Sequence, residues 1–546
     1  MKIKFFLSLL IIAFMSSCYY TEEAVLLIHN AKIYTLDDSF SIAEAIAIKD
    51  GKIIEVGPNN ELKNRYNAKE EIDARLRPIY PGFIDAHCHF LWYGNTFFEV
   101  DLVGTKSWQE VLDRTIAFSE KTEDLWITGR GWDQNDWDSK SFPSKEQLDS
   151  LFPERAVLLK RIDGHAAIAN QKALELANIS PASKIDGGVF EKKNGHLTGI
   201  LIDNAVDSVS KVVPELSKTQ MQRALLKAQE MCFEKGLTTV DDAMLENEMV
   251  HAIDELQKSG DLKMKVYGML MPTEENKEEF LKNGPYLTDR LSIRSFKYFA
   301  DGALGSRGAR LLHPYHDDPH NKGLFLNDSN YFLTEAEALY EAGFQMNTHC
   351  IGDAANRMIL DIYAQVLKST NDKRWRIEHA QIVEPSDLEK FKMYTIIPSV
   401  QPTHATSDMY WVNDRLGEKR AKTAYAYKEL LEQIGLLALG TDFPIEDIDP
   451  LKTFYAAVVR KDDKGYPQEG FQTENSLSRK DALKGMTIWA ALSNFEENQK
   501  GSLEIGKDAD FIILDKDIMQ VKESDILSTK VLSTYVNGEL VFEVKK

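Results

Sequence analysis

Short apolar runs alternate with helix-like segments through the central part of the chain. Downstream of Lys297, runs rich in Ile, Val and Phe are separated by segments such as LTEAEALYEAG, AANRMILDIYAQVLKS and EPSDLEKFKMY. Strands separated by helices of this length indicate βαβ units and a parallel sheet, and enough such units can close a barrel. The pattern therefore predicts an α/β barrel, whose chemistry would lie at the carboxyl ends of the strands.

Both ends of the chain have a different pattern, in which apolar and polar residues alternate. AVLLIHNAKIYTLDD and EAIAIKDGKIIEVG show it near the N-terminus, and DADFIILDKD and STYVNGELVFEV show it near the C-terminus. This period of two is typical of strands with one buried face. We expect residues 24–78 and 500–546 to form one small β-sandwich around a barrel of residues 79–499. Residues 95–203 would be a subdomain inserted after the first barrel strand.

Several polar residues stand where the apolar runs end, which is where a barrel collects its functional groups. They are His87, His89, His349, His379 and Asp442, and Lys297 occupies a similar position between them. Imidazole and carboxylate are ligands of a borderline divalent ion such as zinc. His87 and His89 are two residues apart and can reach the same ion, whereas Cys88 between them should point away. The residues together predict a metal centre.

Each of these residues also has a plainer interpretation. A single histidine in an apolar strand is more often a packed residue than a ligand, so the prediction depends on the whole set. Cys88 and Cys350 adjoin proposed ligands, but neighbouring side chains diverge on a strand, so we interpret both as packed thiols. Glu378 should point away from His379 for the same reason and is expected to be structural.

A series of ordered motifs resembles one known family. The motifs are PGFIDAHCHF, GRGWDQNDW, RIDGHAAIAN, FKYFADGALGSRGA, THCIGDAA, IEHAQ, PSVQPTH, WVNDRLG, GTDFP and GSLEIGKDADFIIL, and they span nearly all of the chain after its first residues. They resemble the amidohydrolase superfamily, and most closely the branch called amidohydrolase family 3, which includes enzymes similar to N-substituted formamide deformylase. The resemblance implies a distorted TIM (β/α)8 barrel with a β-sandwich built from both termini.

The resemblance also implies a division of labour among the polar residues. His87, His89 and Asp442 would hold one divalent ion, expected to be zinc, and His349 and His379 a second. Lys297, carboxylated by carbon dioxide, would bridge the two ions, because an unmodified lysine is cationic and repels a metal. A metal-activated hydroxide would then attack the substrate, with Asp442 as the proton shuttle. Whether one or two ions bind is left open.

Other motif residues are candidates for binding the substrate, and each has a structural alternative. In RIDGHAAIAN, His165 could donate to a substrate oxygen beside Asp163, or the pair could brace a turn. In GRGWDQNDW, Arg130 and Trp132 could supply a cation and an aromatic wall, or form a packed hairpin. His404 in QPTHA and Arg415 in DRLG could line the pocket or be purely structural.

Composition and charge fit a globular protein and argue against one class of partner. The chain has 546 residues, of which 43% are hydrophobic and 27% charged, and its formal net charge is −20. With a pI near 5.2 and no basic stripe, nucleic acid is not an expected partner. The run HPYHDDPH resembles a metal site in outline, but its prolines and acids indicate an exposed loop.

The first residues resemble a bacterial lipoprotein signal. MKIKFFLSLLIIAFMSSC begins with lysines, continues with an apolar stretch too short for an ordinary membrane span, and ends in small residues before Cys18. Residues 1–17 would be removed and Cys18 lipidated, which would anchor the protein at the bacterial cell envelope, facing the periplasm or the exterior. Met15 departs from the usual leucine of this signal. The alternative is an ordinary signal peptide or membrane anchor.

These observations lead to a prediction of function. We expect a metal-dependent hydrolase that cleaves a non-peptide carbon–nitrogen bond of a small-molecule amide, such as an N-substituted formamide or an N-acyl amine. An esterase or lactonase with the same metal centre is the first alternative, because the site does not distinguish amide from ester. A binding protein that kept the barrel and lost activity is the second. A homodimer is left open.

Overall fold

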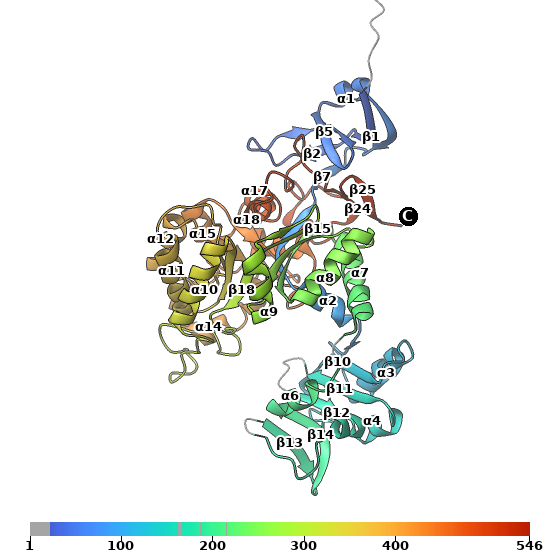
Figure 1. The fold of residues 1–546 in the computed structure, drawn as a ribbon, viewed down its shortest axis with the longest axis vertical. Coiled ribbons are helices and arrows are strands. Elements are labelled where there is room, and N and C mark those ends of the chain that lie inside the picture. The colour runs from blue at the N-terminus through green and yellow to red at the C-terminus, as the bar shows by residue number, and fades with distance from the viewer. Residues whose placement is uncertain (1–21, 162–165, 186–187, 215, 546) are drawn as a thin grey trace, which may run out of the picture.

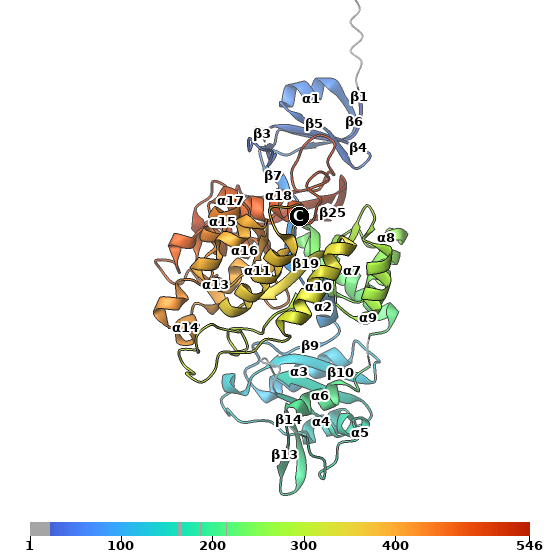
Figure 2. The ribbon, with the colours of Figure 1, turned by 60° about the vertical axis from the view of Figure 1, so that its left-hand side comes forward.

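The computed structural model describes residues 22–161, 166–185, 188–214 and 216–545 of the chain. A barrel occupies the middle of the molecule, a β-sandwich lies beyond one end of it, and an inserted subdomain lies beyond the other (Figures 1 and 2). None of the helices in the described residues is both long and apolar enough to cross a bilayer.

Eight parallel strands form a nearly closed barrel, as the alternation of apolar runs and helices predicted. In sheet order the strands run β22-β21-β20-β19-β18-β16-β15-β8, and the short β17 (Tyr286–Leu287) pairs with β18 from outside this path. Their bounds are β8 (Phe83–Cys88), β15 (Leu237–Leu245), β16 (Lys265–Leu270), β18 (Leu291–Phe299), β19 (Gln345–Cys350), β20 (Arg376–His379), β21 (Ile397–Val400) and β22 (Ala438–Leu439). Most of their residues are buried, as expected where helices cover the outside of a parallel barrel.

Amphipathic helices cover the outside of the barrel. They include α7 (Lys218–Glu234), α8 (Asn247–Ser259), α10 (Ser329–Ala342), α11 (Asp353–Leu367), α12 (Glu389–Met393), α15 (Tyr427–Ile434), α16 (Pro450–Val459), α17 (Arg479–Gly485) and α18 (Ile488–Ser493). Local signals set their ends: a capping box of Ser217 and Gln220 starts α7, and left-handed Gly260 follows α8. Their apolar faces pack on the strands in one large core.

Two sheets built from both ends of the chain form the β-sandwich. One sheet, in the order β5-β4-β1-β6, is N-terminal only, and the other, β25-β24-β23-β7-β2-β3, combines the two ends. The strands are β1 (Glu22–His29), β2 (Lys32–Tyr34), β3 (Ile42–Ala43), β4 (Ala45–Lys49), β5 (Lys52–Gly57), β6 (Tyr66–Asp73), β7 (Pro78–Pro81), β23 (Phe511–Leu514), β24 (Val531–Val536) and β25 (Glu539–Glu543). A separate core holds the sheets together, with Ile28 and Ile33 from one end packed with Phe511 and Tyr535 from the other.

The inserted subdomain is a six-stranded sheet with its own helices. Its strand order is β13-β14-β12-β11-β10-β9. The elements are β9 (Val100–Asp101), β10 (Trp126–Trp132), β11 (Ala156–Arg161), β12 (Ala166–Ala169), β13 (Gly188–Lys193), β14 (His196–Asp203), α3 (Trp108–Ser119), α4 (Glu146–Leu151), α5 (Gln171–Leu176) and α6 (Asn204–Ser210).

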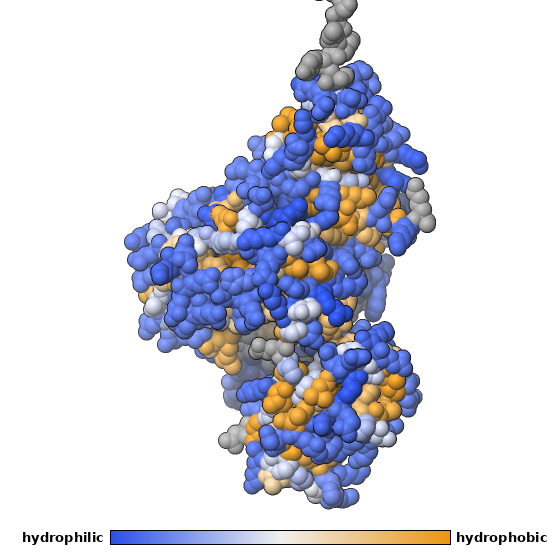
Figure 3. Space-filling view, turned by 45° about the vertical axis from the view of Figure 1, so that its right-hand side comes forward, coloured by the Kyte–Doolittle hydropathy of each residue, from blue (hydrophilic) through white to orange (hydrophobic). Residues whose placement is uncertain are grey.

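The subdomain is connected to the barrel by the chain segment that follows the first barrel strand. It lies beyond the barrel end where α2 (Phe90–Thr96) begins, which is the carboxyl end of β8 (Figures 1 and 2). Hydrophobic side chains gather over part of its surface, whereas the surface of the barrel is mostly hydrophilic in this view (Figure 3). The subdomain therefore stands over the same end of the barrel as the predicted metal centre.

Candidate metal centre

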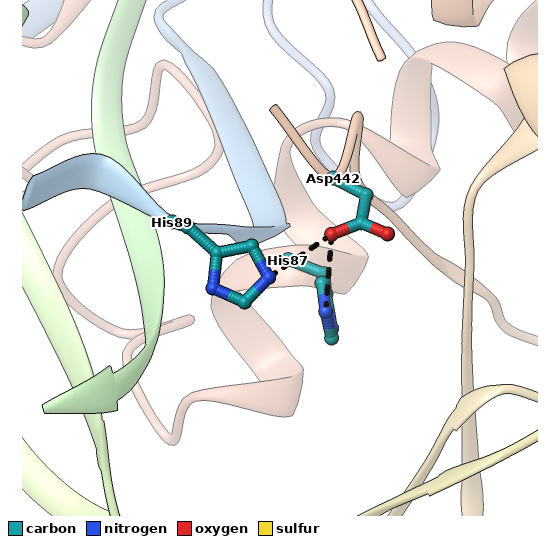
Figure 4. Close-up of side chains that lie close together, drawn as sticks. All are labelled: His87, His89 and Asp442. Atoms are coloured by element: carbon teal, nitrogen blue, oxygen red, sulfur yellow. Dashed lines mark ion pairs between the residues drawn. The ribbon is translucent and has the colours of Figure 1, made fainter. Parts of the chain in front are cut away.

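His87, His89 and Asp442 face one another at the carboxyl end of the barrel (Figure 4). His87 belongs to β8, His89 follows it at the start of α2, and Asp442 lies just after β22. Asp442 Oδ1 is 3.6 Å from His87 Nε2 and 3.2 Å from His89 Nε2. One donor atom of each side chain lies within 4.8 Å of the others, so a single ion can contact all three.

Hydrogen bonds fix which ring nitrogen each of these histidines presents. His87 Nδ1 lies 2.5 Å from Glu378 Oε2, and His89 Nδ1 lies 3.2 Å from Ala243 O. Because both partners can only accept, each Nδ1 is the protonated nitrogen. The Nε2 lone pairs of both rings therefore point at Asp442, which is the arrangement that a metal ligand requires.

The chain segment 440–443 is bound to β8 by backbone and side-chain hydrogen bonds, which closes the barrel beside the site. Asp442 N donates to His87 O at 2.8 Å, and His89 N donates to Phe443 O at 2.8 Å. Asp85 accepts from Thr441 N at 2.9 Å and from Thr441 Oγ1 at 2.7 Å. These bonds hold the strand with the two histidines and the segment with Asp442 in fixed register.

Gly440 is required where this segment crosses β8. A Cβ atom at this position would lie 2.5 Å from His87 N and 2.8 Å from His87 O, which is closer than real Cβ contacts. Glycine alone lets the two backbones approach closely enough to bring Asp442 over His87.

His349 and His379 complete a cluster of imidazoles around the same point. His349 is in β19 and His379 ends β20. The centroid of the His379 ring is 4.5 Å from that of His349 and 4.9 Å from that of His87. His349 Nε2 lies 3.7 Å from Asp301 Oδ1, and Asp301 is itself held by the backbone N–H groups of residues 351 and 352. The two histidines thus extend the site away from His89.

Buried atoms without partners show that these residues fit a cation. Among the described residues, His349 Nε2, His379 Nδ1 and Asp442 Oδ1 are buried and have no hydrogen-bond partner. Leaving such atoms unpaired costs about 1–3 kcal/mol each, so a cluster of them at one point is unusual in a purely structural site. Nitrogen and carboxylate donors of this kind are the ligands of zinc and similar ions.

Burial keeps the proposed ligands in the ionisation states that bind metal. Burial, together with nearby Lys297, lowers the pKa of His87 to about 4 and that of His349 to about 3. The pKa of His379 is also well below its usual value because the ring is buried. Burial opposes ionisation of Asp442, but the hydrogen bond from His404 and the neighbouring His89 outweigh it, so its pKa is well below the usual range. His87, His349 and His379 are therefore neutral and Asp442 is charged at neutral pH.

Lys297 lies in the centre of the cluster, where β18 ends. Its side chain is 1% exposed, and its Nζ is 3.4 Å from His87 Nε2 and 4.5 Å from the centre of the Phe299 ring. In the described part of the chain no carboxylate forms an ion pair with it. Burial lowers the pKa of Lys297 to about 8, although Glu378 and Asp442 act in the opposite direction.

His404, in α13 (Pro402–Asp408), contacts the second oxygen of Asp442. Its Nε2 is 3.1 Å from Asp442 Oδ2, and its Nδ1 is 3.2 Å from Glu446 Oε1. Burial disfavours the charged ring, but the hydrogen bonds to Asp442 and Glu446 outweigh burial and raise the pKa of His404 well above its usual value. His379, His404 and Asp442 also offer donor atoms within 4.8 Å of one another. The sequence had suggested only a pocket-lining role for this histidine.

Glu378 is a site residue that the sequence argument had set aside. It was expected to point away from His379, yet its carboxylate contacts His87 in the interior of the barrel. The reason is that His379 ends β20 with a φ of 70°, which breaks the strand geometry and lets both neighbours reach the site. Glu446, Asp85 and Asp301 were also missed, although each lies within a few residues of a proposed ligand in the motifs.

Two of the candidate substrate-binding residues have side chains that contact other parts of the fold. Trp132 is 0% exposed in the core of the inserted subdomain, and its indole N–H donates to Leu159 O at 2.8 Å. Arg415 forms an ion pair with Asp317 at 2.5 Å, and its Nε donates to Gly305 O at 3.1 Å. For both residues these contacts favour the structural alternative: Trp132 packs in the core of the subdomain, and Arg415 holds the loop after β18.

The remaining candidates lie elsewhere or outside the described residues. Arg130 is an exposed residue of β10 in the inserted subdomain. Asp163 and His165 lie outside the described residues, and so does Cys18 with the segment before it. The histidines of HPYHDDPH are exposed, as expected of a loop. The described cysteines are buried free thiols, and Cys88 and Cys350 are packed as expected.

Comparison with known sequences identifies relatives along nearly the whole chain. The model of the amidohydrolase family matches residues 70–542. The putative amidohydrolase YtcJ of Bacillus subtilis is 32% identical over 94% of this chain and 99% of its own length. The N-substituted formamide deformylase of Arthrobacter pascens is 25% identical over 96% of this chain and 99% of its own length.

Comparison with solved structures gives the same result. An uncharacterized metal-dependent hydrolase from Pyrococcus furiosus superposes with a TM-score of 0.77 and 30% identity, covering 91% of this chain and 100% of its own. Its counterpart from Pyrococcus horikoshii has a TM-score of 0.78 at 30% identity, covering 91% of this chain and 99% of its own. The shared fold thus extends over about nine-tenths of this chain.

Proposed function

Since the chain belongs to the amidohydrolase family and is a metal-dependent hydrolase, we propose that it cleaves a non-peptide carbon–nitrogen bond of a small amide. An N-substituted formamide or an N-acyl amine is the proposed substrate class. The relative named N-substituted formamide deformylase supports this choice, because it aligns with this chain from end to end.

The proposed ligands of one or two divalent ions, zinc in the first place, are His87, His89, Lys297, His349, His379 and Asp442. The observation that carries the assignment is the convergence of buried donor atoms without partners on one point at the carboxyl end of the barrel. A bound ion would supply a more acidic water and polarise the scissile carbonyl.

Asp442 and His404 are placed to handle protons at this point. Asp442 Oδ1 faces the histidine ligands, whereas its Oδ2 is held by His404 Nε2. Because it is ionised and nearly buried, Asp442 can take a proton from the attacking water and return it to the leaving nitrogen. His404 lies between Asp442 and Glu446 and orients the Asp442 carboxylate.

We propose further that Lys297 is carboxylated. A carbamate on Nζ converts a cation into an anionic oxygen ligand, which removes the conflict with the ligand nitrogen of His87 only 3.4 Å away. The lowered pKa supports this, because carbon dioxide reacts with the neutral amine and a pKa of about 8 leaves a useful fraction neutral at pH 7 to 8.

Metal analysis joined to a substrate screen tests the proposal. Purified protein is loaded with zinc, its metal content is measured by plasma mass spectrometry, and hydrolysis is followed on matched pairs of amides and esters. We expect bound metal, loss of activity with a chelator, and preference for the amides. Faster hydrolysis of esters or lactones would assign the site to that chemistry instead, and a protein that binds no metal would contradict the ligand assignment.

A further inference from the structure

An ion network fills the interior of the barrel directly beneath the candidate metal centre. Glu378 and Arg376, both in β20, are 0% exposed and lie on the same face of the strand. Glu378 Oε2 binds His87 Nδ1 at 2.5 Å, while its Oε1 accepts from Arg376 Nε at 2.7 Å. Each oxygen of one carboxylate thus has its own donor.

Arg376 is held in place by groups from other elements. Its Nη1 donates to Asp241 Oδ2 at 2.9 Å and to Asn494 Oδ1 at 3.2 Å. Its Nη2 donates to Ser399 Oγ at 3.0 Å and also to Ala86 O. Because strands β8, β15, β20 and β21 and the end of α18 all contribute, the guanidinium cannot move without disturbing the barrel.

This network converges on one proposed ligand from two sides. Glu378 binds the ring of His87, and Arg376 binds the carbonyl of Ala86, which is the peptide group immediately before it. The bond to Glu378 requires a proton on Nδ1, which leaves Nε2 as the only nitrogen free to bind an ion. Carboxylates that hold the second nitrogen of a ligand histidine fix the tautomer and the orientation of the ring.

We propose that Glu378 is the positioning residue that makes His87 a metal ligand, and that Arg376 keeps Glu378 in the orientation this requires. The inference deepens the proposed function and rests on its ligand assignment. Arg376 Nε donates to one oxygen of Glu378 at 2.7 Å, and His87 Nδ1 lies 2.5 Å from the other. The carboxylate therefore stays an acceptor on both oxygens.

Substitution by glutamine has a definite chemical consequence at this position. The side chain of Glu378→Gln has one oxygen, for which Arg376 Nε–H and His87 Nδ1–H would compete. The guanidinium is the stronger, charged donor, so the amide oxygen should turn to Arg376 and the amide NH2 to His87. His87 would then accept on Nδ1 and carry its proton on Nε2, where it blocks the metal.

The experiment compares Glu378→Gln with a control inside the same network. Asp241→Asn removes a carboxylate from the other side of Arg376 without touching His87, since the Asp241 carboxylate bonds to Arg376 and Asn494 among the described residues. Zinc affinity is measured by competition with a chromogenic chelator, and the geometry of the site is followed by the visible spectrum of the cobalt-substituted protein. Melting of the metal-free proteins reports on the barrel itself.

We expect Glu378→Gln to lower metal affinity about 10- to 100-fold and to change the cobalt spectrum, while Asp241→Asn leaves both near wild type. Glu378→Asp keeps two acceptor oxygens and should recover part of the affinity. If Glu378→Gln does not fold, Glu378→Asp carries the test, with weaker binding than wild type expected.

Other outcomes would overturn the inference. Equal metal affinity in Glu378→Gln and wild type would show that His87 needs no fixed partner. Equal losses in Glu378→Gln and Asp241→Asn would mean that the network only stabilises the barrel. A wild-type protein that binds no metal is a different result, because it would contradict the ligand assignment of the proposed function.

Discussion

At the scale of single residues, Asp442 has two functions that one substitution can separate. Its Oδ1 faces His87 and His89, and its Oδ2 faces His404. Asp442→Asn keeps an oxygen for the metal but removes the basic oxygen that accepts a proton. We expect the variant to retain metal and to lose about 100- to 10,000-fold in kcat, as general-base variants do. Steady-state kinetics on an amide substrate, with metal content measured in parallel, checks this.

The control for Asp442→Asn is Asp447→Asn, a nearby carboxylate whose ion pair is with Lys452 rather than with the site. It should leave kcat within a factor of a few. Near wild-type turnover in Asp442→Asn would refute the proton-shuttle role, and loss of all metal would show that Asp442 acts first as a ligand.

Residue-level sequence reasoning succeeds where the strand geometry is regular and fails where it is not. The period of two correctly separates His87 from Cys88, whose thiol packs against Asp241 O outside the site. The same rule misplaced Glu378, because the backbone of His379 leaves the extended region at the end of β20. Such a break depends on packing at the strand end and has no local signature in RIEHAQ.

At the scale of elements, the contact between β8 and segment 440–443 determines whether the two halves of the site meet. Asp85 is 2% exposed and accepts three hydrogen bonds, from Thr441 N, Thr441 Oγ1 and His87 N. Asp85→Ala leaves these donors buried without an acceptor, so we expect a loss of about 3 kcal/mol of stability. Thermal unfolding of the metal-free protein should show it, and metal affinity should fall as Asp442 and His87 separate.

Thr441→Val is the matched control for the Asp85 prediction. It removes the hydroxyl that donates to Asp85 and accepts from Phe443 N at 3.0 Å, but it keeps the backbone bond to Asp85. It should therefore cost less than Asp85→Ala, about 1–2 kcal/mol. Asp85→Ala with unchanged melting and unchanged metal affinity would show that the backbone bonds between Asp442 and His87 hold the segment by themselves.

The periodic elements of the barrel were predictable, but the inserted subdomain was not predictable in its details. Repeated strands and helices predict a parallel barrel because every βα unit has the same hydrophobic pattern. The sequence left the role of Trp132 open, because an aromatic residue in GRGWDQNDW fits a core and a binding wall equally well. The role of Arg415 was also left open, because its partner, Asp317, is almost a hundred residues away in sequence and only the folded chain reveals the ion pair.

At the scale of the whole molecule, a buried ion cluster joins the barrel to the β-sandwich. Lys265 at the start of β16 is 0% exposed and lies 2.7 Å from Asp508 and 2.6 Å from Asp510, which precede β23. Lys52 of the sandwich contacts Asp508 at 2.5 Å. Lys265→Met would leave two buried carboxylates without their cationic partner, so we expect the free energy of unfolding to fall by about 3–5 kcal/mol at pH 7. Thermal unfolding at several pH values is the measurement.

The pH dependence of this loss of stability follows from the direction in which the pKa of Asp508 is shifted. Burial opposes its charge, but Lys265 outweighs burial and lowers the pKa below the usual value. A lowered folded pKa gives stability that is present above the unfolded pKa of about 4 and is lost as pH falls through the folded value. The difference in unfolding free energy between wild type and Lys265→Met should therefore become smaller below about pH 4.

Lys263→Met supplies the comparison for Lys265. Lys263 pairs with Glu539 on the surface, with its side chain 35% exposed, so its loss should cost less than about 1 kcal/mol. Two results would contradict the role of the buried cluster in joining the barrel to the sandwich. One is a similar loss of stability in both variants. The other is a stability difference between wild type and Lys265→Met that does not change in acid.

The position of the molecule in the cell is the largest-scale proposal, and it depends on residues outside the described structure. We propose that residues 1–17 are removed and that Cys18 is lipidated, so that the enzyme is held at the bacterial cell envelope. The sandwich, whose first strand β1 begins at Glu22, lies beyond the barrel end opposite the inserted subdomain (Figures 1 and 2). An anchor there would leave the metal centre facing away from the membrane.

Substitution of Cys18 tests the anchor. One thioether-linked diacylglycerol brings two acyl chains, which suffice for stable membrane attachment. Wild-type protein expressed in a bacterial host should therefore take up labelled palmitate and sediment with membranes, whereas Cys18→Ser should do neither while its hydrolytic activity stays unchanged. Cys232→Ser, a change at a buried thiol of the barrel, should still be labelled. Membrane attachment that survives Cys18→Ser would favour an uncleaved N-terminal anchor over a lipoprotein.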